Sequence, residues 1–185
     1  RLAWDFIEEI GLPALRREYA QLHVSGSYYG LFLDLEHPDE RYLRRTGLDP
    51  GGNLYKAKEV PREFGLNPPP DPGVSEKEPG TYPESWEEET NKGGDFSDIE
   101  EFVGSMHLDG FTAPSREFWE SRTYPELMIG FQLAQVVLNN FDSAIKNLFL
   151  YHDFVQDRWA LLTWDMDLIV GKWFFLGAVD LAEMG

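Results

Sequence analysis

Three oxygen-bearing side chains in the C-terminal third of the sequence have the types and spacing of a metal site. Asp142 and Asn147 lie five residues apart in a polar segment, and Asp165 follows an apolar run further along. An acid, an amide and a second acid can share one divalent cation, and magnesium prefers oxygen ligands. In phosphoryl-transfer enzymes this order supplies an aspartate that accepts the hydroxyl proton, then an asparagine and an aspartate that hold Mg²⁺. The sequence therefore predicts a metal–phosphate site.

Each of these motifs has another interpretation when it is taken alone. Asp and Asn commonly form turns and cap loops. The triplet Asp165-Met166-Asp167 is also typical of a site for a sugar nucleotide and Mn²⁺. Asp167 is a weaker candidate, which would either support a metal ligand from behind or bind the metal's waters. The glycine-rich and lysine motifs that cradle phosphates in many nucleotide-binding proteins are absent from the sequence, as is a His-Arg-Asp triplet.

Hydrophobic periodicity and turn residues predict the elements that must position these side chains. The predicted helices span residues 1–10, 38–47, 97–106 and 124–140, the third with a capping box at Ser97 and Glu100. The predicted strands span residues 18–24, 28–36, 53–56, 148–151 and 159–164. Short turns at 25–27 and 153–157 make two of these pairs hairpins. The fold class is therefore α+β, with Asp142 and Asn147 between a helix and a strand and Asp165 at a strand end.

The charge balance excludes several classes of partner. Sixteen basic and 33 acidic residues give a formal net charge of −17. Nucleic acid and anionic membranes would both be repelled, so we expect neither as a partner. The chain has no cysteine, which excludes disulfides, thiolate zinc sites and cysteine nucleophiles. Its most apolar run, 168–181, is interrupted by Lys172 and Asp180 and is too short to span a bilayer, so no membrane insertion is expected.

Residues 61–94 differ in composition from the rest of a single predicted domain, 1–185. Seven of the twelve prolines lie in this stretch, which predicts an exposed insertion. The overlapping segment 84–101 holds eight acids and one lysine, and we interpret it as a solvated acidic face. The four histidines lack the spacing of a zinc motif and are expected to be structural. Because the sequence begins with Arg1 inside a helical pattern, we expect it to be part of a longer protein.

Several short runs, in one order along the chain, are the most specific feature of the sequence. They include Tyr28-Tyr29-Gly30-Leu31-Phe32-Leu33, Leu54-Tyr55-Lys56 and Asp95-Phe96-Ser97-Asp98-Ile99, and they end in the block Asn140-Phe141-Asp142, Asn147-Leu148-Phe149-Leu150-Tyr151 and Trp164-Asp165-Met166-Asp167. These runs resemble the spore coat protein H (CotH) kinase family, whose members are atypical protein kinases, secreted or on the spore surface. Fungal members act as surface adhesins. Phe141 departs from the family pattern, which usually has Trp there.

The resemblance implies a protein-kinase-like, two-lobed fold, here as a fragment that lacks the first N-lobe strands. It implies that Asp142 is the catalytic aspartate and that Asp165 binds the metal, with Asn147 as second ligand. The expected reaction is phosphoryl transfer from ATP, with Mg²⁺ or Mn²⁺, to the hydroxyl of a protein substrate. The expected location is extracellular, at the cell or spore surface.

The nucleotide contacts are less directly implied. If the elements of the chain follow the order of those in protein kinases, the hairpin 18–36 leads to a hinge at Glu36. The phosphate-binding lysine then lies either upstream of Arg1 or at Lys56. A non-catalytic, kinase-like binding module is the alternative. Such an adhesin or assembly component would bind a surface partner and explain the acidic composition equally well.

Overall fold

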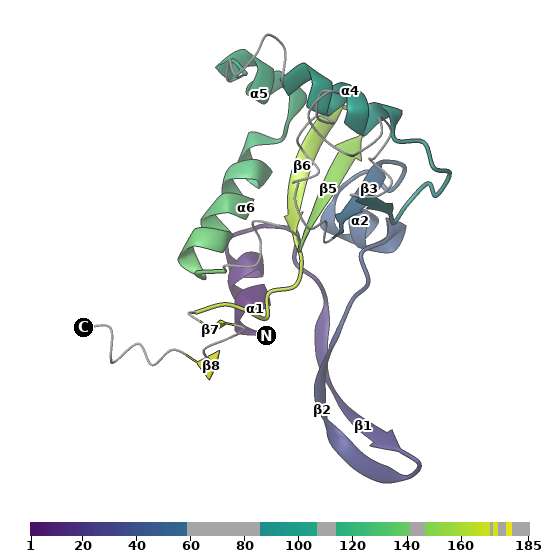
Figure 1. Ribbon diagram of the computed structural model, residues 1–185, viewed down its shortest axis with the longest axis vertical. Helices are drawn as coiled ribbons and strands as arrows, with labels where there is room; N and C mark the ends of the chain where they lie inside the picture. The colour runs from purple at the N-terminus through teal and green to yellow at the C-terminus, as the bar shows by residue number, and fades with distance from the viewer. Residues whose placement is uncertain (59–85, 107–113, 141–146, 171, 174–176, 179–185) are drawn as a thin grey trace, which may run out of the picture.

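The computed structural model describes residues 1–58, 86–106, 114–140, 147–170, 172–173 and 177–178 (Figure 1). The helices in these ranges are α1 (Leu2–Glu9), α2 (Glu40–Thr46), α4 (Ser97–Met106), α5 (Arg116–Arg122) and α6 (Pro125–Val137). The strands are β1 (Arg17–Val24), β2 (Ser27–Leu35), β3 (Asn53–Ala57), β4 (Trp86–Glu88), β5 (Leu148–Asp153), β6 (Arg158–Thr163), β7 (Lys172–Trp173) and β8 (Gly177–Ala178). All pairs between these strands are antiparallel, which confirms the α+β class.

A four-stranded sheet in the order β4-β3-β5-β6 forms the centre of the molecule. Its side chains alternate between two buried faces, as the two-residue period of a strand requires. One face packs on α1, α2 and α6 through Leu54, Phe149, Tyr151, Ala160 and Leu162. The other face packs on α4 through Tyr55, Trp86, Leu150 and Trp159. Both faces of the sheet are thus covered. The polar residues that precede and follow its strands lie at the two ends of the sheet.

Local hydrogen bonds and backbone conformation set where helix α2 begins and ends and where helix α4 begins. The side chain of Asp39 accepts hydrogen bonds from the backbone N–H groups of Arg41 and Tyr42, at 2.8 and 3.2 Å, and so caps α2. Gly47 ends this helix in the left-handed region, at φ 82°, as predicted. At α4 the sequence predicted Ser97 as the cap, but Asp95 supplies the acceptor, 3.0 Å from the Ser97 N–H.

Strands β1 and β2 form a separate two-stranded sheet, residues 17–35, which we call the arm; it projects from the body (Figure 1). This hairpin confirms the prediction for 18–36. The Arg17 guanidinium fixes its base to α1, since it donates to Asp5 at 2.5–2.8 Å and to Glu8 at 2.6 Å. The arm is therefore held at its base and extends outward from it.

Some elements differ from the sequence predictions. Residues 86–88 were predicted to belong to the exposed insertion 61–94. They form strand β4 instead, which pairs with β3, and Trp86 is buried. Thr90 is also buried, because its hydroxyl accepts from the Leu54 N–H and donates to the Gly52 carbonyl, both at 2.8 Å. Residues 61–85 of that predicted insertion lie outside the described ranges. Helix α5 and strands β7 and β8 were not predicted from the sequence.

No helix in the described part of the chain has both the length and the apolar character needed to cross a membrane.

Candidate active site

Strand register brings three of the predicted site residues to one end of the central sheet. Lys56 on β3 is opposite Phe149 on β5, and Leu148 at the start of β5 is opposite Thr163 at the end of β6. Asn147 directly precedes Leu148, and Asp165 follows Thr163 by two residues. Lys56, Asn147 and Asp165 therefore lie at the same end of three neighbouring strands.

Lys56 lies beside the segment that carries Asp165. Its Nζ atom is 5.4 Å from the centre of the Trp164 ring, a cation–π distance. The Trp164 ring in turn meets the Phe149 ring edge-on, with centroids 5.4 Å apart and planes at 76°. The indole thus fixes both the amine of Lys56 and the start of the Trp164–Asp167 segment. The ammonium group of Lys56 therefore lies at the same end of the sheet as Asn147 and Asp165.

Asn147 and Asp165 share an unusual backbone conformation. Both lie in the left-handed region, with φ values of 65° and 47°. Asn and Asp tolerate this region better than other residues with a β-carbon, so both positions suit the residue types found there. Asn147 is buried, whereas Asp165 and Asp167 are exposed. The sharp turns at the two strand ends therefore orient one buried amide and one exposed carboxylate at the same end of the sheet.

The C-terminal end of α6 is fastened to the Trp164–Val170 segment. The Asn140 side chain is buried and donates to the Gln135 Oε1 atom at 2.9 Å and to the Met166 Sδ atom at 3.2 Å. The Val170 N–H donates to the Leu138 carbonyl at 2.7 Å. Sequence reasoning missed this link, because no local pattern joins residues so far apart along the chain.

Asp142, the predicted catalytic aspartate, lies outside the described residues. The two residues that flank its segment, Asn140 and Asn147, are both described and both buried. Asn140 contacts Met166, and Asn147 precedes the strand that pairs with β6. Asn140 and Asn147 thus both lie beside the segment that carries Asp165.

Glu36, the predicted hinge residue, holds the base of the arm. Its carboxylate pairs with the Arg45 guanidinium and accepts the Arg16 N–H at 3.0 Å. Partial burial raises the pKa of Glu36, but the hydrogen bonds from Arg45 and Arg16 outweigh it and leave the pKa below its usual value. The carboxylate is therefore used in anchoring.

A polar network occupies the opposite end of the sheet, around Asp98 at the start of α4. The Asp98 carboxylate accepts from Tyr55 Oη at 2.6 Å, from Asn53 Nδ2 at 2.9 Å and from the Ile99 N–H at 2.8 Å, and His152 Nδ1 lies 2.8 Å away. The buried His152 fits the structural role expected of the histidines.

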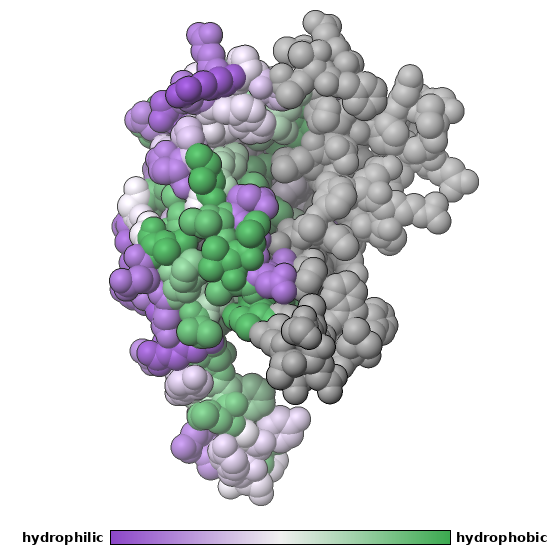
Figure 2. Space-filling model, turned by 90° about the vertical axis from the view of Figure 1, so that its left-hand side faces the viewer, coloured by the Kyte–Doolittle hydropathy of each residue, from purple (hydrophilic) through white to green (hydrophobic). Residues whose placement is uncertain are grey.

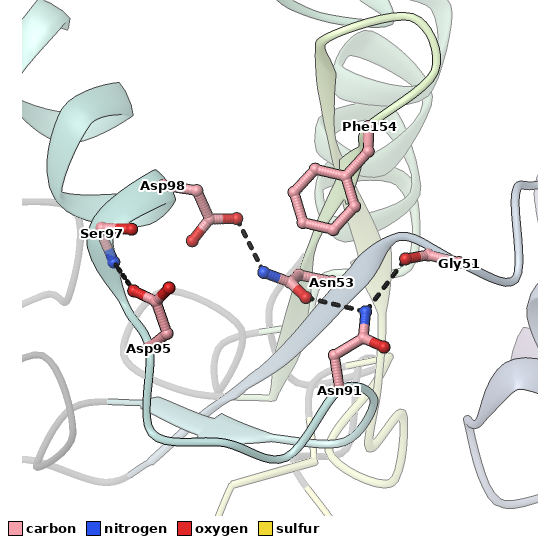
Figure 3. Close-up of a pocket in the computed structure, with 7 residues that line it drawn as sticks. All are labelled: Gly51, Asn53, Asn91, Asp95, Ser97, Asp98 and Phe154. Atoms are coloured by element: carbon pink, nitrogen blue, oxygen red, sulfur yellow. Dashed lines mark hydrogen bonds between the residues drawn. The ribbon is translucent and has the colours of Figure 1, made fainter.

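A hollow of about 380 Å³ adjoins this network (Figure 3). It is lined by Gly51, Asn53, Asn91, Asp95, Ser97, Asp98 and Phe154. The lining amides and carboxylates bond mainly to one another: Asn91 Nδ2 donates to the Gly51 carbonyl at 2.9 Å and to Asn53 Oδ1 at 3.0 Å. Hydrogen bonds within the wall thus occupy much of its polar surface.

The acidic stretch 84–101 is not simply a solvated face. Glu89 is buried, with its carboxylate 3.3 Å from His37 Nε2 and 3.6 Å from Lys92 Nζ. Asp98 belongs to the network described above. Among the described residues, no three Asp, Glu or His side chains converge as a metal cluster. Several acids of the stretch, Glu89 and Asp98 among them, therefore have structural contacts.

Comparison with known proteins agrees with the sequence resemblance. The chain is 25% identical, over 180 residues, to inner spore coat protein H of Bacillus subtilis (strain 168). The match covers 93% of this chain and 46% of the relative, so the chain spans about half the length of the curated relative it matches. The sequence profile of the CotH kinase protein family matches residues 1–176. Since this match covers nearly the whole chain, the protein belongs to the CotH kinase protein family.

Proposed function

We propose that this region transfers the γ-phosphoryl group of ATP to a hydroxyl group of a protein, with Mg²⁺ or Mn²⁺. The observation that carries the proposal is the gathering of Lys56, Asn147 and Asp165 at one end of the central sheet. A cation and two oxygen ligands on adjacent strand ends match what a metal–nucleotide complex needs. Membership of a family described as kinase proteins supports the same reaction.

Each residue has a distinct role in this proposal. Asp142 orients the substrate hydroxyl and accepts its proton while the hydroxyl oxygen forms a bond to the γ-phosphorus. The bond from that phosphorus to the bridging oxygen of ADP breaks in the same displacement. Asn147 and Asp165 would hold the metal, which would neutralise charge on the phosphates. Asp167 would orient waters around the metal. Positioning, rather than covalent chemistry, would supply the rate.

Lys56 contacts the phosphates in this proposal, and Trp164 keeps its amine in place. The fold would then be two-lobed and kinase-like, with the hairpin leading to a hinge at Glu36. The name of the Bacillus relative supports a location at the spore or cell surface, where a protein substrate would be met. Because the chain spans about half of that relative, the proposal concerns this region alone.

The direct test measures transfer of label from γ-phosphate-labelled ATP to protein, with Mg²⁺ and with Mn²⁺. Asp165→Ala should abolish metal-dependent labelling, whereas Asp142→Asn should abolish labelling but keep nucleotide binding. Asp34→Ala, an exposed change on the arm, serves as the matched control. Labelling by Asp165→Ala at the level of the unchanged protein would refute the proposed metal site.

A non-catalytic binding module is the second candidate, and the exposed apolar arm favours it. A thermal-shift titration separates the two functions. ATP at one hundred times its dissociation constant should stabilise a nucleotide-binding protein by about 2.7 kcal/mol. If no metal–nucleotide pair shifts the melting temperature, the binding module is the better account.

A further inference from the structure

The arm exposes an apolar surface to solvent on both of its faces. Seven large apolar side chains of the arm are between 42% and 69% exposed. They are Tyr19, Leu22, Val24, Tyr28, Tyr29, Leu31 and Phe32. Figure 2 shows apolar side chains on this projection below the body. Exposed apolar surface of several hundred Å² usually marks an interaction site.

The construction of the arm also indicates that a partner covers it. A two-stranded hairpin alone is marginally stable in water. The outer edges of β1 and β2 pair with no other named strand of the described chain, so both edges present backbone donors and acceptors. The ion pairs of Arg17 stabilise the base but lie outside the exposed part. An apolar partner would stabilise the rest of the arm.

Charge identifies the kind of partner. Residues 19–33 contain none of the 16 basic and 33 acidic side chains. Two copies of a chain with net charge −17 repel each other wherever their charged surfaces meet. They can meet with least repulsion at residues 19–33 of the arm, which carry no charged side chain and project from the body (Figure 1). A strongly charged partner would gain no ion pair from this surface.

The aromatic rings of the arm are already arranged in pairs. Tyr29 and Phe32 are stacked, with centroids 6.0 Å apart and planes at 8°, and His23 meets Tyr28 edge-on at 5.6 Å. The exposed parts of the seven apolar side chains amount to roughly 700 Å², of the order of the ~800 Å² that each partner buries in a standard interface. Because this area is divided between the two faces, a dimer of standard size would have to use both faces of the arm together with its strand edges.

We infer that the arm is a self-association surface, on which the arm of one copy packs against the arm of a second copy. A two-fold arrangement uses the same residues from both copies and closes at a dimer. This inference goes beyond the proposed function, since it needs neither nucleotide nor metal.

The first test is sedimentation velocity of the 185-residue chain over a wide range of concentrations. The unchanged chain should approach twice the monomer mass, and the double variant Tyr29→Glu/Phe32→Glu should bind itself at least ~10-fold more weakly, about 1.4 kcal/mol. Ile129→Glu is the matched control, because Ile129 is 68% exposed on α6 and carries the same change outside the arm. This control should dimerise like the unchanged chain.

The second test uses the absence of cysteine from the chain. Tyr28→Cys introduces one thiol at an exposed arm position, and mild oxidation should link two copies; Ile129→Cys should not link under the same conditions. Circular dichroism checks that each variant is folded, and if the double variant misfolds, the cross-linking decides. A monomer at every concentration, dissociation by Ile129→Glu, or no cross-link from Tyr28→Cys would overturn the inference.

Discussion

The Nδ1 atom of His152 lies 2.8 Å from the Oδ2 atom of Asp98, although 54 positions separate them in the sequence. The Nε2 atom of the same ring lies 3.2 Å from Asp157 Oδ1. The ring is also stacked on Trp159, at 4.1 Å between centroids. One histidine thus joins α4, strand β5 and the turn of the β5–β6 hairpin. This end of the sheet is fixed by polar contacts, which makes its stability sensitive to pH.

We predict that Asp98→Asn destabilises the protein at neutral pH but much less in acid. Burial raises the pKa of Asp98, but the hydrogen bonds from His152, Tyr55 and Asn53 outweigh it and hold the pKa below its usual value. The carboxylate's contribution is therefore present above the unfolded pKa, near 4, and is lost as the pH falls through the folded pKa. The expected loss at neutral pH is about 1.5–3 kcal/mol of unfolding free energy, measured by urea denaturation.

Asp34→Asn is the control for this prediction, because Asp34 is exposed on the arm and undergoes the same chemical change. It should leave the unfolding free energy within about 0.5 kcal/mol of the original value. An Asp98→Asn effect that stays constant down to acidic pH would contradict the proposed dependence on the charged carboxylate.

We predict that Gly52→Ala is strongly destabilising. A β-carbon at this position would lie 2.4 Å from the His152 carbonyl oxygen and 2.7 Å from the Tyr151 ring. The carbonyl belongs to strand β5 at the centre of the sheet, so the strand itself would have to shift. The expected cost is about 1–3 kcal/mol or more. Thermal or urea denaturation measures it directly.

Gly104→Ala is the matched control, because Gly104 is an exposed position within α4. A β-carbon there has no described neighbour within 4 Å, and alanine favours a helix over glycine. This variant should be more stable by about 0.5–1 kcal/mol. Equal effects of the two substitutions would show that the close approach at Gly52 does not restrict the sheet.

Most elements could be predicted from the sequence because their signals are local. The two hairpins follow from alternating runs around short turns, and Gly47 ends α2 through its own conformation. Strand β4 could not be predicted in this way. Its three residues, Trp86–Glu88, lie in an acidic, proline-rich stretch, and they form a strand because β3 offers an edge. Helix α5 buries no residue, so it lacks the apolar stripe that predicts a helix.

The candidate site shows the same division between local and distant signals. Asn147 and Asp165 could be placed at strand ends because the strands themselves were predicted. The position of Lys56 over Trp164 depends on the register of three strands, which sequence alone does not fix. The Asn140–Met166 contact depends on the tertiary fold in the same way.

We predict that Asn140→Ala destabilises the end of α6. The substitution removes the donor that reaches Gln135 Oε1 and Met166 Sδ, and it leaves the buried Gln135 oxygen without this bond. The expected loss is about 1–3 kcal/mol of unfolding free energy in urea. Gln132→Ala, an exposed position on the same helix, is the control and should change stability by less than about 0.5 kcal/mol. Equal losses would show that the Asn140 link contributes nothing.

The Nζ atom of Lys56 lies 5.4 Å from the Trp164 ring centre, at the same end of the sheet as Asn147 and Asp165. If this amine meets the phosphates of ATP, Lys56→Met should weaken nucleotide binding at least ~10-fold, a loss of about 1.4 kcal/mol measured by calorimetric titration. Among the described residues the substitution removes the cation–π contact with Trp164, so the stability without nucleotide should fall by no more than about 1 kcal/mol. Lys92→Met makes the same change at an exposed position and should bind nucleotide normally. Unchanged ATP affinity in Lys56→Met would assign the phosphate contact to another cation and leave Lys56 as a support for Trp164.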